Sequence, residues 1–175
     1  MVIYITCSDS RFIIYLGKDK FENEELIKWG FPNDIWFHVD KFSSAHVYLR
    51  LPPDITIHTI PKEVMQECLQ LVKDGSKDGR KQEKVSVCYT PWYNLKKTQA
   101  MEVGEVGFKD EKEVYHVKNV TKDKELLKKL LKTKVEKEDA IKHKEELKEK
   151  RFEYIDEIGE AHTNKEDIDY DEDFM

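Results

Sequence analysis

The sequence has no long hydrophobic segment and few cysteines. No run approaches the ~18 apolar residues that a membrane-spanning helix requires, and the N-terminus lacks the basic and then apolar regions of a secretory signal. The three cysteines, Cys7, Cys68 and Cys88, lie far apart and form no CxxC pair. An odd, unpaired set argues against a disulfide framework and against a zinc site. We therefore expect a soluble protein with reduced thiols, in the cytoplasm or the nucleus.

Recognised catalytic motifs are also missing. The chain has no serine elbow, no glycine loop of the P-loop type and no HExxH. A group of acidic and imidazole side chains, Asp34, His38, Asp40 and His46, is similar to an acid–base or metal cluster. A catalytic histidine needs an orienting partner and a nucleophile or water within reach, and aspartates also favour the turns that flank a strand. We therefore expect no catalytic residues, no metal ligands and no cofactor, although a hydrolase using Asp34, His38 and His46 stays open as an alternative.

Charge is unevenly distributed along the 175 residues. Residues 1–121 hold 17 Lys and Arg against 18 Asp and Glu, a net charge of -1. Residues 122–151 hold 12 against 8, net +4, and residues 152–175 hold 1 against 10, net -9. The overall charge of -6 therefore comes almost entirely from the C-terminal end, and it says little about what the folded part binds.

Alternating and apolar runs predict a mostly antiparallel sheet packed by two short helices, an α+β fold. One helix is expected at residues 23–29, ended by Gly30 and Pro32. A second is expected at residues 61–75, where Pro61 suits the first helical position and Gly75 the end. From residue 122 the period becomes helical, and neither proline nor glycine interrupts residues 122–158. A stable coiled coil needs apolar residues at two positions of each heptad, a and d. Only one such position stays partly apolar in this segment, so a coiled coil has little support. The expected parts are an α+β domain at 1–120, a long charged helix at 122–158 and an acidic disordered tail at 159–175.

The stretch Asp34–Leu51 consists of two alternating runs around a small-residue turn, the pattern of two half-buried strands. Side chains alternate across a strand, so one face of this hairpin is aliphatic and the other is not. An outward face of aromatics, imidazoles and a guanidinium is costly to expose without a use. Alternation alone leaves open whether this face is exposed or covered by a helix. The residues of the second face are Trp36, His38, His46, Tyr48 and Arg50.

These residue types suit contact with nucleic acid. Aromatic and imidazole planes can stack on bases, which contributes ~1–3 kcal/mol per base, and a guanidinium can form a bidentate pair with phosphate. Lys96 and Lys97 follow Trp92 and Tyr93 closely, a combination typical of strand-and-loop nucleic-acid binders. The predicted nucleic-acid-binding residues fall into two groups. We expect phosphate contacts from Lys18, Lys20, Arg50, Lys96 and Lys97, and stacking on or hydrogen bonding to unpaired bases from Trp36, His38, His46 or Tyr48.

Four segments stand out by their order and spacing: Leu16–Leu26 (LGKDKFENEEL), Asp34–His38 (DIWFH), Ser44–Arg50 (SAHVYLR) and Val85–Thr90 (VSVCYT). They resemble the NFACT-R family, the RNA-binding module of ribosome-quality-control factors. The resemblance extends over residues 1–118. It implies an α+β domain that binds tRNA or ribosomal RNA, in association with the ribosome and without catalysis.

The chain also departs from the larger members of this family. Those factors carry a further N-terminal domain that helps to recruit tRNA, whereas this chain starts in its first predicted strand, so we do not expect peptide-tail elongation activity. The turn at Ser43-Ser44-Ala45 has no glycine where relatives often have one, which argues against a left-handed backbone there. The charged helix and the acidic ending are similar to a short eukaryotic form of the family.

Two further functions stay open beside RNA binding. In the first, the chain is an adaptor whose helix at 122–158 docks to a partner helix or to a ribosomal protein. In the second it binds DNA, because some relatives of the short form are described as membrane-associated DNA receptors. Nothing in the sequence is typical of a membrane span, and residues 105–122 are far too charged for one.

Overall fold

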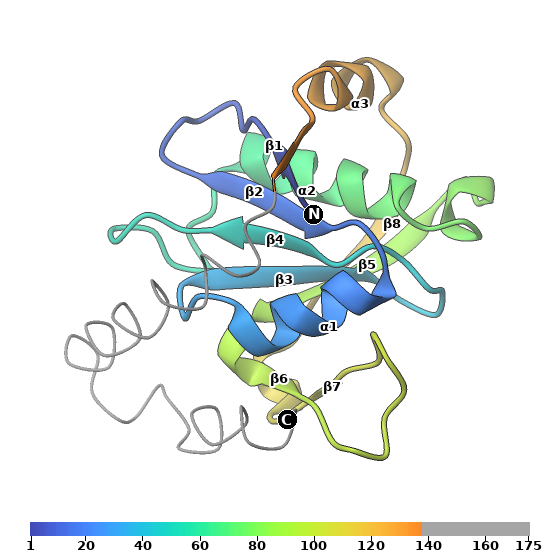
Figure 1. Cartoon of the computed structure of the whole chain (residues 1–175). Coiled ribbons are helices and arrows are strands. Elements are labelled where there is room, and N and C mark those ends of the chain that lie inside the picture. Colours follow the sequence, from blue (N-terminus) through green and yellow to red (C-terminus); the bar gives the residue numbers. More distant parts are fainter. Residues whose placement is uncertain (138–175) are drawn as a thin grey trace.

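The computed structural model describes residues 1–137 and shows an α+β domain built on one antiparallel sheet (Figure 1). Seven strands lie in the order β8-β5-β3-β4-β2-β1-β9, and a separate two-stranded ribbon pairs β6 with β7. The strands of the main sheet are β1 (Val2–Ile5), β2 (Ile13–Gly17), β3 (Asp34–Val39), β4 (Val47–Arg50), β5 (Val85–Pro91), β8 (Tyr115–Val120) and β9 (Val135–Lys137). The remaining elements are α1 (Lys20–Trp29), α2 (Lys62–Asp74), α3 (Lys124–Leu131), the ribbon strands β6 (Leu95–Lys96) and β7 (Gly107–Phe108), and the 3₁₀ turns η1 (Gly79–Lys81), η2 (Trp92–Asn94) and η3 (Glu111–Glu113).

Both faces of the sheet are covered. Helices α2 and α3 lie on one face, and α1 with the β6–β7 ribbon lies on the other (Figure 1). The first face packs aliphatic side chains of the strands, such as Ile35, Phe37 and Leu49, against Val64 and Leu127. The second face forms a smaller and more aromatic core. Because both faces bury side chains, the sheet has no solvated aromatic surface across its centre.

The predicted elements of the first 120 residues are largely confirmed. The predicted hairpin pairs as expected, with Trp36 opposite Tyr48, and the helix expected at 61–75 is α2. The helix expected at 23–29 begins three residues earlier, because Asp19 accepts a hydrogen bond from the N–H of Glu22 (2.9 Å) and acts as its N-cap. The N-cap signal therefore outweighs the later start of the apolar periodicity.

The helix predicted at 122–158 is interrupted within the described residues. α3 begins at the N-cap Asp123 and ends at Leu131. Thr133 closes this end, since its hydroxyl donates to the Leu130 carbonyl (2.6 Å) and accepts from the N–H of Thr6 (3.0 Å).

The chain then returns to the sheet as β9, which pairs antiparallel with β1. Without β9, β1 would be an edge strand with a row of unpaired backbone groups, and this pairing outweighs the local helical pattern. The rest of the predicted helix, from residue 138, and the acidic tail at 159–175 lie outside the described residues. Within residues 1–137 no helix is both long and apolar enough to cross a membrane.

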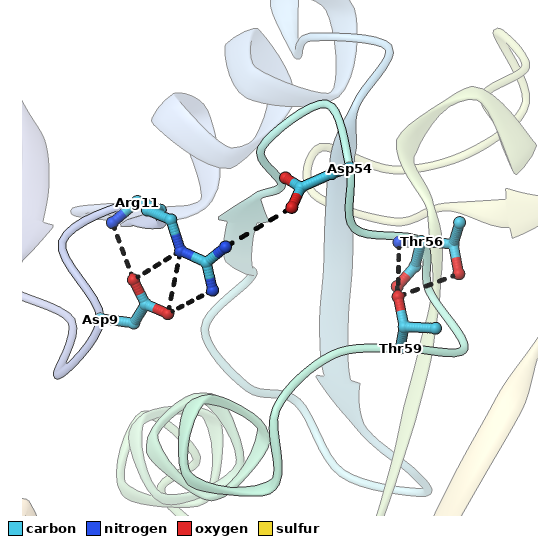
Figure 2. Close-up of polar contacts among 5 residues, drawn as sticks. All are labelled: Asp9, Arg11, Asp54, Thr56 and Thr59. Carbon is cyan, nitrogen blue, oxygen red and sulfur yellow. Dashed lines mark hydrogen bonds and ion pairs between the residues drawn. The ribbon is translucent and has the colours of Figure 1, made fainter.

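At one end of the sheet, an arginine joins two loops. Arg11, in the β1–β2 turn, contacts Asp9 through Nη2 (2.9 Å) and Asp54 through Nη1 (3.6 Å), as Figure 2 shows. In the loop of Asp54, the N–H of Thr56 donates to the Thr59 hydroxyl (2.9 Å). These contacts are exposed to solvent, so they order the loop that leads into α2 but add little to the stability of the fold.

Candidate nucleic-acid interface

The aromatic face of the β3–β4 hairpin is largely inside the protein. Trp36 and Tyr48 are 2% and 0% exposed, covered by α1 and the β6–β7 ribbon. Tyr48 stacks on Tyr15 of β2, with ring centroids 4.9 Å apart. This settles the alternative that alternation left open: the face is covered. Tyr48 as placed cannot stack on a base, and Trp36 can act only through the groove described below.

Arg50 lies at the other end of this face, in a buried ion pair. Its Nε donates to the carboxylate of Asp34 (3.0 Å), which is fully buried, and its guanidinium lies 3.5 Å from the centre of the Phe31 ring. The same carboxylate accepts from the Tyr15 hydroxyl and from the N–H of Phe31 (2.9 Å). Arg50 was predicted to reach phosphate, but its charge is used to compensate Asp34.

Lys97 is a second predicted phosphate contact that the fold uses internally. Its ammonium group donates to the backbone carbonyls of Glu102 and Glu105 and pairs with Glu24 of α1 (3.0 Å). Glu24 also accepts from the N–H of Gly104 (2.8 Å), whose φ of +84° suits glycine. Lys97 therefore fastens the loop between β6 and β7 onto α1. Its neighbour Lys96 is exposed.

Beside this loop, the sheet is open to solvent in a groove of about 750 Å³. We call it the histidine groove. Its walls come from the start of α1, the end of β3, the β3–β4 loop and the β6–β7 loop. Four of the predicted residues meet here, although they come from three separate segments. The side chains that define the groove are Lys20, Trp36, His38, Lys41, His46 and Phe108.

Rings are packed against one another along the floor of the histidine groove. His38 stacks on Trp36 with centroids 5.3 Å apart and planes 12° apart. His46 meets both rings edge-on, at 5.3 Å from Trp36 and 5.2 Å from His38. Phe108 closes the group with an edge contact to Trp36 at 5.7 Å. The half-buried His38 is thus held in one orientation by its neighbours.

Burial keeps both imidazoles uncharged near neutral pH. It lowers the pKa of His46 to about 3, and His38 and Lys97 act in the same direction. The pKa of His38 is also lowered by burial, which outweighs the opposite effects of the Val39 carbonyl and of Asp40. His38 Nδ1 lies 2.6 Å from the Val39 carbonyl and so must carry the ring proton. Its Nε2 is then a hydrogen-bond acceptor.

The rim of the histidine groove mixes charges of both signs. Lys20 and Lys41 are exposed there, and Asp40, Glu102 and Glu105 also line it. Such a rim gives no strong positive field, so the groove suits a neutral ring with an adjacent phosphate better than a row of phosphates.

The turn before His46 has a left-handed residue, but not where relatives often have glycine. Lys41 has a φ of +71°, whereas residues 43–45 have no positive φ. The expectation against a left-handed backbone at Ser43-Ser44-Ala45 is therefore confirmed. Lys41 and Phe108 are groove residues that sequence reasoning missed. Only the position of Lys41 in the loop between two signature strands could have pointed to it.

Of the acidic and imidazole residues that were compared with a catalytic or metal cluster, His38, Asp40 and His46 all line the histidine groove, whereas Asp34 lies apart, with Arg50. Asp40 also pairs with His116 Nδ1 (3.0 Å). Among residues 1–137, no group of three His, Cys, Asp or Glu side chains is arranged to hold a metal ion.

Comparison with known proteins connects this geometry to a family. Residues 1–110 match the family described as the NFACT protein RNA binding domain. The chain belongs to the NFACT-R family. All residues that line the histidine groove lie inside the matched region.

The chain is similar to curated proteins from several eukaryotes. It is 47% identical over 150 residues to the coiled-coil domain-containing protein 25 homolog of Dictyostelium discoideum, covering 86% of this chain and 73% of that protein. It is 56% identical over 140 residues to coiled-coil domain-containing protein 25 of Mus musculus, with 78% and 67% covered. Protein JLP2 of Saccharomyces cerevisiae is 47% identical over 126 residues, with 70% and 61% covered. The expected similarity to the short eukaryotic form is thus confirmed.

A solved structure supports the fold. The C-terminal part of the fibronectin/fibrinogen-binding protein from Streptococcus suis superposes with a TM-score of 0.60 at 22% identity. The match covers 75% of this chain and 48% of the solved chain. At this identity it shows a shared fold and nothing of shared ligands.

Proposed function

We propose that this NFACT-R protein binds RNA without catalysing a reaction, and that an unpaired nucleotide enters the histidine groove. The observation that carries the proposal is the convergence of Lys20, Trp36, His38 and His46 on one groove inside the region matched to an RNA-binding family. The RNA is tRNA or ribosomal RNA in contact with the ribosome, as the resemblance to quality-control factors implies.

The chemistry of the groove supports an unpaired base rather than a base pair. His38 offers a ring plane that is held by Trp36, and stacking on such a plane tolerates any base. Its Nε2 accepts a hydrogen bond from an amino or imino N–H on the edge of the base. Lys20 and Lys41 on the rim contact the flanking phosphates as point charges.

Replacing His38 with alanine is expected to weaken RNA binding. Loss of one stacking plane costs ~1–3 kcal/mol, which corresponds to a fall in affinity of roughly 5- to 150-fold. His38→Phe keeps the plane but loses the acceptor, so it should retain most of the affinity for a uniform single strand. Fluorescence anisotropy of the full chain with a labelled, unstructured RNA measures both effects.

His58→Ala is the matched control, because His58 is an exposed histidine outside the groove. Thermal unfolding of each variant separates lost binding from lost folding. If the normal chain binds RNA and His38→Ala binds as tightly as His58→Ala, the groove is not the site. A matched DNA strand is measured in parallel, and tighter binding of DNA than of RNA would favour the DNA-receptor alternative instead.

A further inference from the structure

The opposite face of the molecule carries a groove with concentrated positive charge. It runs between the C-terminal end of α2 and α3, with a volume of about 480 Å³. We call it the lysine groove. Its location differs from that of the histidine groove, because α2 and α3 cover the other side of the sheet (Figure 1). Its lining side chains are Asp74, Lys122, Lys124, Leu127, Lys128, Leu131 and Lys132.

Four exposed lysines line this groove, and three of them are aligned. Lys124, Lys128 and Lys132 recur every four residues, which places them on one side of α3. All are exposed, and none of their ammonium groups forms a salt bridge or hydrogen bond with another described side chain. Like charges at this spacing repel by about 0.2–0.5 kcal/mol per pair. The dipole of α3 favours cations at its C-terminal end, where Lys128 and Lys132 lie, so the helix tolerates the stripe and its charges stay exposed beside the groove.

The acidic residues of the same segment do not neutralise this stripe. Asp123 caps the helix by accepting from the N–H of Leu126 (3.1 Å). Glu125 lies three residues before Lys128 and four before Lys129, so it offsets at most one charge of the stripe, and it does not line the groove. Asp74 is the single acidic side chain among the described residues that line the groove.

Two cations beside the groove, Lys73 of α2 and Arg80 of η1, add positive charge next to it. Lys73 is buried, and its ammonium group donates to the carbonyls of Gly79 (3.1 Å) and Gln82 (2.9 Å). These bonds hold the η1 turn so that Arg80 lies beside Lys122 and Asp74 in a small pit next to the groove. Burial lowers the pKa of Lys73, and the charge of Lys122 lowers it further.

We propose that the lysine groove is a second RNA contact, which binds phosphates of the RNA backbone without reading bases. The inference rests on the proposed RNA-binding function and gives the RNA a second site. Positive charge without an aromatic plane suits the sequence-independent part of binding. The histidine groove differs in both respects: its floor consists of aromatic and imidazole rings, and its rim carries charges of both signs. α3 also lies beyond the region matched to the family, at residues 1–110.

Because the two grooves lie on opposite faces of the sheet, only a long or folded RNA can occupy both. Binding at one groove then raises the effective concentration of RNA at the other, and the two contacts reinforce each other. The lysine groove should therefore contribute to the salt dependence of binding to long RNA, and the histidine groove to its preference for unpaired bases.

The test uses the full chain with the double variant Lys128→Ala plus Lys132→Ala. Removing two phosphate contacts should make the slope of log affinity against log salt less steep by about 1.4 for a single strand. The matched control is Lys129→Ala plus Lys134→Ala, which removes the same charge from the same segment outside the groove. Circular dichroism checks that both double variants fold. His38→Ala should lower affinity and leave the slope unchanged.

Lysine acylation footprinting provides a second measurement that needs no variant. Lys122, Lys124, Lys128 and Lys132 should react freely in the protein alone and be protected when a long oligouridine is added. If RNA binds and depends on His38, but the slope is the same in both double variants, the lysine groove is not a phosphate site. If the four lysines are already protected from acylation without RNA, the acidic residues 152–175 of the chain occupy the groove, and the proposal of an RNA contact there is wrong. Absence of any RNA binding would overturn both proposals.

Discussion

Replacing Asp34 with alanine is expected to lower the free energy of unfolding by about 3–5 kcal/mol, because it leaves the charge of Arg50 without its partner in a buried site. The carboxylate is fully buried and accepts from Arg50, from the Tyr15 hydroxyl and from the N–H of Phe31. All three donors lose this buried acceptor at once, which adds to the cost. Urea denaturation followed by tryptophan fluorescence measures the loss.

The matched control is Asp54→Ala, which removes an aspartate from an exposed pair with Arg11 (Figure 2). That pair is open to solvent, so its loss should leave the denaturation midpoint nearly unchanged. A loss of stability in Asp34→Ala no greater than in Asp54→Ala would mean that the ion pair does not hold this end of the sheet. RNA binding by the folded fraction should persist, because Asp34 lines neither groove.

The protein is expected to lose stability steeply below pH 6.5, and His46 is the main cause. Its pKa is about 3 when folded, because burial disfavours the charged ring, against an ordinary value of 6.5. Between these values the unfolded chain binds a proton that the folded chain does not bind. The free energy of unfolding therefore rises with pH across this window, by up to about 1.4 kcal/mol per pH unit, and the cost is absent above it.

His46→Gln should flatten this dependence, because glutamine does not titrate. The readout is the slope of the free energy of unfolding against pH between 4 and 7, so a general loss of stability in the variant does not affect the conclusion. His58→Gln, which removes an exposed histidine outside the groove, is the matched control variant. Equal slopes in His46→Gln and the normal chain would contradict a buried, neutral His46. Part of the slope should remain in either case, since burial also lowers the pKa of His38.

Much of the fold follows from local patterns in the sequence. Alternation predicted the β3–β4 hairpin and its two faces, and the signals at Pro61 and Gly75 predicted α2. The end of α3 could not be predicted in this way. Residues 132–137 carry no helix breaker, and they leave the helical path because β1 offers them an unpaired edge. That edge exists only once the rest of the sheet has formed.

The candidate site was predicted in part. Residue type and spacing pointed to His38, His46 and Lys20, which meet in one groove. The same reasoning predicted that Arg50 and Lys97 would contact phosphate, but tertiary partners use both charges. A sequence shows that a side chain can bind an anion. It does not show whether a carboxylate or carbonyl of the same chain has already taken that role.

If RNA reaches this protein through the histidine groove, bases of the bound RNA lie against its lining. Photo-crosslinking of the full chain to an RNA that contains 4-thiouridine, followed by mass spectrometry of the adducts, locates these contacts. We expect adducts in the segments that line the groove, residues 36–46 and 101–108. Adducts confined to other segments, at RNA concentrations that saturate binding, would contradict this expectation.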